Sequence, residues 1–214
     1  MTTREMAWLV EQEVKKLASS LYEATSTGVQ EAQTRCRGWK HETYPHFRPL
    51  VVRIGLREHL VATGLPPGWE IAGNPGLMGQ VYLKHPELGV KLRFLKERRS
   101  TYPGGVPVAG KNPARRRAWE QPLPGLEVRR LRPEPEVEFL LLWDYVVTSL
   151  GEFRLRLVHT LEPGRYGQAV RCDVDVDIQP GGELIGDFQF RGGDDDPDLF
   201  GETEVEIDRS ENGE

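Results

Sequence analysis

The chain contains few cysteines and no long apolar run, and each shortage excludes a class of protein. Only two cysteines, Cys36 and Cys172, occur among its 214 residues, far apart and without a CxxC spacing. Such a pair supplies neither a disulfide framework nor the ligands of a structural zinc site. The longest apolar run, residues 139–143, is much shorter than the roughly 20 residues that cross a bilayer. Residues 1–8 also lack the layout of a secretory signal. We therefore expect a cytoplasmic protein with no membrane segment, no metal and no cofactor.

Positive and negative side chains are separated along the chain, although the formal net charge is only −5. Residues 91–132 hold 12 basic and 3 acidic residues, a net charge of +9. Residues 173–214 hold 2 basic and 15 acidic residues, a net charge of −13. This separation predicts that the basic segment contacts a polyanion, an acidic partner or the acidic segment of the same chain. Arginine outnumbers lysine 21 to 7, which is typical of a bacterial coding sequence of high GC content.

The clearest fold signal is a pair of alternating runs, Phe153–His159 and Cys172–Ile178. Apolar and polar residues alternate in both, which predicts two strands that each bury one face. The turn residues between the runs predict an antiparallel hairpin. The register that buries the apolar face places arginines opposite aspartates: Arg154 opposite Asp177, and Arg156 opposite Asp175.

The rest of the chain contains helical and strand patterns. Apolar residues recur at three- and four-residue spacing from Met6 to Leu21, which predicts an amphipathic helix. It begins at a capping box of Thr2 and Glu5 and ends near Ser26–Gly28, and a loop follows over residues 29–47. The other predicted elements are a helix at Pro49–Thr63, a strand at Trp69–Ala72, a hairpin of Met78–Lys84 with Val90–Lys96, a helix at Pro113–Gln121 capped by Asn112, a central strand at Val137–Val147 and a last strand at Leu184–Arg191.

Together these patterns predict an α+β protein. Two N-terminal amphipathic helices pack on a mainly antiparallel sheet of about five or six strands. Residues 1–191 form a single domain, with a helical part over 1–64 and a sheet part over 69–191. A basic, loop-rich insertion covers residues 97–136, and residues 192–214 form an acidic tail.

The main candidate site is residues 80–132, which combine clustered positive charge with aromatic residues. Lysine and arginine neutralise phosphates and aromatic rings stack on bases, so this segment is typical of a surface that binds nucleic acid or another polyanion. Pairing with the acidic C-terminal segment, or simple solvation, are the alternatives. The candidate binding residues are Lys91, Arg93, Lys96, Arg98, Arg99, Lys111, Arg115, Arg116, Arg117, Tyr82 and Trp119.

A phosphate-binding loop is a weaker hypothesis. Gly105–Lys111 has the GxxxxGK spacing, and Asp144 ends a strand-like run as a metal-binding acid would. However, Asn112 replaces the hydroxyl residue that would hold Mg²⁺, and no predicted strand leads directly into the loop. We do not favour nucleotide hydrolysis.

Asp173, Asp175 and Asp177 share one side of a predicted strand, as some metal sites require. The same register pairs these carboxylates with Arg154 and Arg156, and we favour this ion-pair ladder over a metal site.

Histidines are the remaining candidates. His59, beside Glu58, and His159 could act in acid–base catalysis, but no GxSxG motif accompanies them. His41 and His46 lack the further ligands of a metal site. Packed or surface side chains are the favoured interpretation.

Three functions fit these patterns. The favoured one is a non-enzymatic binding or regulatory protein whose basic surface, residues 80–132, engages nucleic acid or an acidic partner. Its acidic C-terminal segment would compete for that surface. The second is a small nuclease or RNA-directed toxin that uses His159 or the Asp173–Asp177 cluster. The third is an assembly protein whose Arg-rich and Asp-rich regions pair between the subunits of an oligomer.

Overall fold

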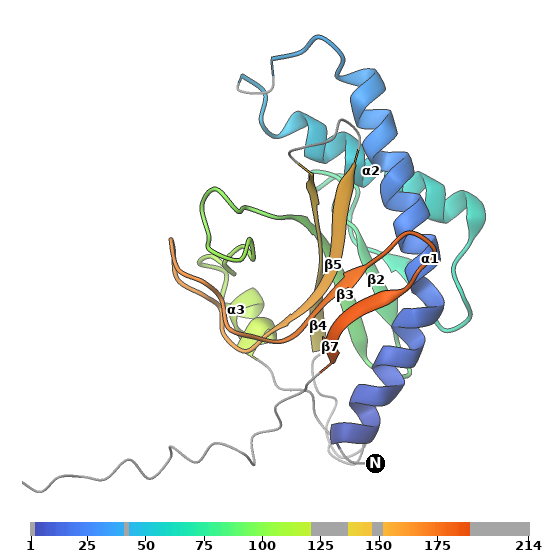
Figure 1. The fold of residues 1–214 in the computed structure, drawn as a ribbon, viewed down its shortest axis with the longest axis vertical. Helices are drawn as coiled ribbons and strands as arrows, with labels where there is room; N and C mark the ends of the chain where they lie inside the picture. Colours follow the sequence, from blue (N-terminus) through green and yellow to red (C-terminus); the bar gives the residue numbers. More distant parts are fainter. Residues whose placement is uncertain (1–2, 41–42, 121–136, 147–151, 189–214) are drawn as a thin grey trace, which may run out of the picture.

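The computed structural model describes residues 3–40, 43–120, 137–146 and 152–188, in which three helices pack on a seven-stranded sheet (Figure 1). Helices α1 (Thr3–Arg35) and α2 (Phe47–Thr63) lie on one face of the sheet, and α3 (Pro113–Glu120) lies on the other. The predicted α+β class is confirmed. None of the helices in these ranges is long and apolar enough to cross a membrane. The predicted acidic tail and the second part of the insertion, residues 121–136, lie outside the described ranges.

Helix α1 continues to Arg35, past the predicted end near Gly28. The hydroxyl of Thr27 donates to the carbonyl oxygen of Glu23 at 3.0 Å, so this side chain is satisfied within the helix. At Gly28 the helix crosses α2 so closely that a Cβ atom would lie 2.4 Å from the carbonyl oxygen of Val52. The predicted end and the predicted loop over residues 29–35 are therefore wrong, because this glycine serves helix packing. The capping residue Thr2 lies outside the described ranges.

Helix α2 agrees closely with the prediction. It begins two residues before Pro49 and ends at Thr63, as expected. Gly64 follows with a φ of 81°, and its N–H donates to the carbonyl oxygen of Leu60, which closes the last turn.

The strands lie in the sheet in their chain order, from β1 to β7. All neighbours are antiparallel except β3 and β4, which run parallel. A parallel pair needs a crossover connection, and the insertion that contains α3 supplies it. The described sheet has seven strands, whereas about five or six were predicted. The strands are β1 (Glu70–Ala72), β2 (Tyr82–His85), β3 (Val90–Lys96), β4 (Val137–Tyr145), β5 (Phe153–Thr160), β6 (Cys172–Ile178) and β7 (Leu184–Phe188).

The hairpin of β5 and β6 forms as predicted, but its register is shifted by two residues. Arg156, rather than Arg154, lies opposite Asp177, and a bulge at His159 and Thr160 disturbs the pairing near the turn. A shift of two keeps every side chain on its predicted face. The predicted ion pairs therefore form diagonally across the strands. Arg154 donates to Asp177 at 2.6 and 2.7 Å, and Arg156 donates to Asp175 at 2.7 Å.

Each face of the sheet carries an apolar core. The larger core joins the sheet to α1 and α2 and includes the six apolar residues predicted to be buried in the β5–β6 hairpin. The smaller core joins the other face to the insertion, where Trp119 of α3 packs with Leu140, Leu142 and Val158. Residues 97–120 therefore cover the face of the sheet that also carries the arginine–aspartate pairs of β5 and β6.

Cys36 is buried and Cys172 is partly buried. Burial, reinforced by the nearby Asp175, raises the pKa of Cys172 to about 12. The thiolate fraction of Cys172 at pH 8 is then on the order of 1 in 10,000. We expect iodoacetamide to alkylate the folded protein about a thousandfold more slowly than the denatured protein. Mass spectrometry can follow both rates, and rapid native labelling at Cys172 would contradict the raised pKa.

Candidate anion-binding site

A polar pocket of about 240 Å³ lies between α3 and the strands β2, β3 and β4. It brings together four of the eleven residues predicted to bind polyanions, and these come from three separate elements. Its position on the α3 side of the sheet places it away from α1. The pocket is lined by Gln80, Tyr82, Lys91, Arg93, Asn112, Ala114, Arg115, Ala118 and Glu138.

Glu138 of β4 is the single carboxylate among the described residues that line this pocket, and it is only 2% exposed. Lys91 Nζ lies 2.6 Å from its Oε2 atom, Arg93 Nη1 lies 3.4 Å from Oε1, and the indole N–H of Trp119 donates to Oε1 at 2.9 Å. Burial alone would raise the pKa of Glu138. The charge and hydrogen bond of Lys91, the Trp119 hydrogen bond and the charge of Arg93 outweigh burial and hold the pKa below its usual value. Glu138 is therefore anionic at neutral pH.

Arg115 reaches the pocket from the first turn of α3. Asn112 caps that turn as predicted, because its Oδ1 atom accepts hydrogen bonds from the N–H groups of Ala114 at 3.0 Å and Arg115 at 3.2 Å. The Arg115 guanidinium donates to the carbonyl oxygen of Ala109, but its Nε atom has no hydrogen-bond partner among the described residues. Burial and the neighbouring charge of Arg93 lower the pKa of Arg115, so the group sits in an environment that disfavours its charge.

The pocket consequently has a surplus of positive charge. Three cations, Lys91, Arg93 and Arg115, face one carboxylate, which leaves a net charge of +2. The ring of Tyr82 holds two of the cations in place, since Lys91 Nζ and the Arg93 guanidinium carbon lie 5.1 and 5.2 Å from its centroid. A partly enclosed surplus of this kind favours an anionic ligand.

The other predicted residues lie in two groups. Lys96 and Arg99 are paired with carboxylates, at 2.5 Å from Asp144 and 2.6 Å from Glu97. Four cations are exposed on the surface of the insertion: Arg98, Lys111, Arg116 and Arg117.

Trp119 does not reach the surface. It is 1% exposed, and its indole N–H donates a hydrogen bond to Glu138. The prediction that Trp119 is an exposed residue that stacks on bases is therefore wrong. Tyr102, another aromatic residue of the insertion, is also buried. The sequence interpretation also missed the enclosed acids Glu97 and Glu138. Glu138 carries a recognisable signal, since it is the one carboxylate in the apolar run 137–143.

The three aspartates of β6 are each engaged by side chains of β5. Asp175 and Asp177 bind Arg156 and Arg154, as described above, and Asp173 lies 2.6 Å from Nδ1 of His159. His159 is fully buried and its ring packs against Phe139. Among the described residues no group of three or more histidine, cysteine or acidic side chains could hold a metal ion. The predicted pairing with arginine is confirmed for Asp175 and Asp177, whereas Asp173 contacts His159 instead.

The GxxxxGK segment precedes α3 but does not form a free phosphate cradle. Val106 and Ala109 are buried in the smaller core, and the N–H of Ala109 donates to the carbonyl oxygen of Pro163. A Cβ at Gly105 would lie 2.7 Å from Glu97, so an acid occupies the space beside this glycine. The preceding strand, β3, ends at Lys96, well before the loop.

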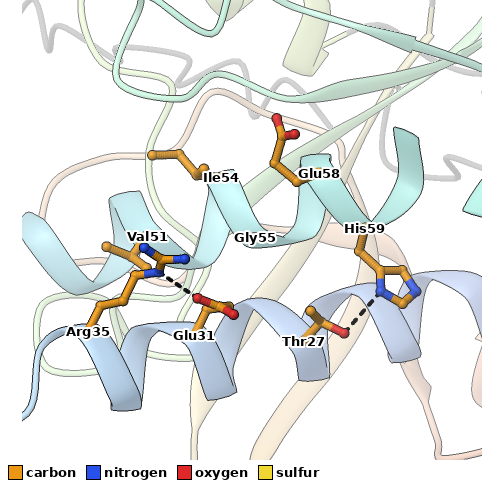
Figure 2. A pocket seen from close by; sticks show the side chains of 8 residues that line it. All are labelled: Thr27, Glu31, Arg35, Val51, Ile54, Gly55, Glu58 and His59. Carbon is orange, nitrogen blue, oxygen red and sulfur yellow. Dashed lines mark hydrogen bonds and ion pairs between the residues drawn. The ribbon is translucent and has the colours of Figure 1, made fainter. Parts of the chain in front are cut away.

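A larger cleft of about 350 Å³ lies between α1 and α2 (Figure 2). Its polar groups pair with one another: Arg35 donates to Glu31 at 2.5 Å, and Thr27 lies 3.1 Å from Nδ1 of His59. Glu58 points away from α1 in this view, so His59 and Glu58 do not converge. The cleft lacks the surplus charge of the α3 pocket, which we therefore take as the candidate site.

Comparison with protein-family models, with curated proteins and with solved structures gave no match to this chain.

Proposed function

We propose that the protein is a non-enzymatic binding protein that engages nucleic acid through its basic surface. The main support for this proposal is the pocket, in which three cations, Lys91, Arg93 and Arg115, accompany one described carboxylate, Glu138. Phosphate groups suit this pocket because guanidinium groups donate two parallel hydrogen bonds to phosphate oxygens. The exposed cations of the insertion extend the positive surface beyond the pocket and supply contacts to further phosphates.

The acidic C-terminal segment, residues 192–214, is proposed to compete with nucleic acid for this surface. Its charge is opposite to that of the insertion, and both belong to one chain, so their effective concentration is high. Replacing Asp194, Asp195 and Asp196 with asparagine should therefore increase affinity for nucleic acid.

Fluorescence anisotropy with a labelled single-stranded oligonucleotide, measured across a salt series, tests the proposal. The three phosphate contacts in the pocket contribute about −2 to the slope of log K against log salt, and contacts made by the exposed cations of the insertion make the slope steeper. An Arg115→Gln variant should bind about tenfold more weakly and show a slope smaller by about 1.

Arg37→Gln is the matched control. Arg37 is exposed just beyond the end of α1, which lies on the other face of the sheet. The substitution removes the same charge and should leave affinity nearly unchanged. Absence of binding at low salt, or equal effects of the two substitutions, would overturn the proposed function.

A further inference from the structure

A second pocket adjoins the basic pocket and shares two of its residues, Gln80 and Arg93. It has a volume of about 120 Å³ and lies beside the residues that precede β2 and the last residues of β3. The last backbone contact there is the N–H of Phe94 with the carbonyl oxygen of Val81, at 3.4 Å. The two pockets meet at Gln80 and Arg93 and therefore offer one ligand two adjoining hollows.

Arg53 brings a fourth cation to this region from α2. Its Nε atom is buried and has no hydrogen-bond partner among the described residues, and burial lowers the pKa of its guanidinium group. None of the described residues that line the second pocket is acidic. Among the described residues that line the two pockets, four cations (Arg53, Lys91, Arg93, Arg115) accompany one carboxylate, Glu138. A half-buried guanidinium group without a carboxylate is unfavourable unless an anionic ligand group approaches it.

The rim of the second pocket is apolar. Leu77 and Met78 are 61% and 57% exposed, although both are large hydrophobic residues. Met78 has a φ of 55°, a conformation that non-glycine residues seldom adopt. The turn is held by hydrogen bonds of 2.9 Å from Gly76 N–H to Asn74 Oδ1 and from Gly79 N–H to the Pro75 carbonyl oxygen. The chain thus fixes two apolar side chains in solvent beside a basic groove.

We propose that the two pockets form one groove selective for single-stranded nucleic acid, an inference that rests on the proposed function. Neighbouring phosphates contact Arg53 and Arg93 in one pocket and Lys91 and Arg115 in the other. An unpaired base packs on Leu77 and Met78. A duplex keeps its bases paired and stacked inside the helix, so it can use the cations but not this apolar rim.

The test compares a labelled single strand with the duplex of the same length and sequence, using the full chain across a salt series that begins at low salt. We expect the single strand to bind about tenfold more tightly. Arg53→Gln should weaken binding of both the single strand and the duplex by about tenfold, because both can use the cations of the groove.

The Met78→Asn variant tests the apolar contact with the base without changing the charge of the groove. Asparagine tolerates positive φ, so the turn should persist while the apolar side chain is lost. The preference for the single strand should fall several-fold with no change in the salt slope, since no charge is removed. Val61→Asn, at an exposed apolar position near the end of α2, is the control and should change neither value. Unchanged thermal unfolding of each variant shows that it folds.

The outcomes distinguish this inference from the proposed function. Equal binding of both nucleic acids, with the Arg115→Gln effect retained, overturns the groove and leaves the binding function standing. An unchanged preference in the folded Met78→Asn variant also overturns the groove. Absence of salt-dependent binding to either nucleic acid overturns both proposals.

Discussion

An Arg156→Met variant is expected to lose about 3 kcal/mol or more of unfolding free energy, because it leaves a buried carboxylate without its main partner. Arg156 is buried between the sheet and the insertion and donates to three groups: the carboxylates of Glu97 and Asp175 and the carbonyl oxygen of Gly104. It therefore ties two points of the insertion to the β5–β6 hairpin. Methionine keeps much of the side-chain volume, so the expected loss reflects charge and hydrogen bonding more than packing.

Glu97 explains the size of this effect. Its side chain is fully buried, and its remaining ionic contact is Arg99 Nε at 2.6 Å from Oε2, which is not aligned as a hydrogen bond. Arg99 is partly exposed, so solvent weakens this contact. Removing Arg156 thus leaves Glu97 with insufficient compensation inside the protein.

Arg154→Met provides the matched control for Arg156→Met. Arg154 lies two residues earlier on the same face of β5 and forms two hydrogen bonds to Asp177, but its side chain is substantially exposed. Exposed pairs contribute at most about 1 kcal/mol. Urea unfolding followed by circular dichroism gives both free energies. Equal losses in the two variants would show that burial of the Arg156–Glu97 pair has no special weight, and a double Glu97→Gln, Arg156→Met variant should recover part of the loss.

A Gly28→Ala variant is expected to lose about 2–3 kcal/mol of unfolding free energy. Helix propensity alone predicts the opposite sign, since alanine is favoured over glycine inside a helix by about 1 kcal/mol. The structure reverses that expectation because a Cβ atom at Gly28 would lie 2.4 Å from the carbonyl oxygen of Val52 and 3.1 Å from the amide nitrogen of Leu56. Both atoms belong to the α2 backbone, so relief requires the helices to move apart.

The close crossing of the two helices also restricts Gly55 on α2. A Cβ at Gly55 would lie 2.7 Å from the Cα atom of Gly28, so Gly55→Ala should be destabilising as well. Gln30→Ala, at an exposed position on α1, is the control and should change stability by no more than about 0.5 kcal/mol. Chemical unfolding measures all three variants, and a Gly28→Ala protein that is more stable than the native chain would contradict the close crossing.

Prediction from the sequence was most successful where the pattern is local. The β5–β6 hairpin, α2, α3 with its Asn112 cap, and the central strand β4 all follow from the spacing of apolar residues and from capping or turn residues. The length of α1 was not predicted, because Gly28 has the same local signature whether it ends a helix or permits a close crossing. Its partner in that crossing, Gly55, is distant in sequence.

The candidate site could likewise be predicted from the sequence only in part. The sequence showed where positive charge is concentrated, and Tyr82, Lys91, Arg93 and Arg115 belong to that predicted set. It did not show that Glu138 would lie among them, nor that Arg53 would reach the adjoining pocket from α2.

The sequence by itself determined the type and approximate place of the helices and strands, except for the C-terminal part of α1, and also the apolar face of each strand of the β5–β6 hairpin and the separation of opposite charges. Only the tertiary structure decided the two-residue shift of the hairpin register, the parallel pairing of β3 with β4, and the grouping of cations around one buried carboxylate. The physical reason is that side-chain alternation has a period of two, so a shift by two leaves the sequence pattern unchanged. Parallel pairing and pocket formation depend on contacts between distant segments, and these arise when both faces of the sheet are covered.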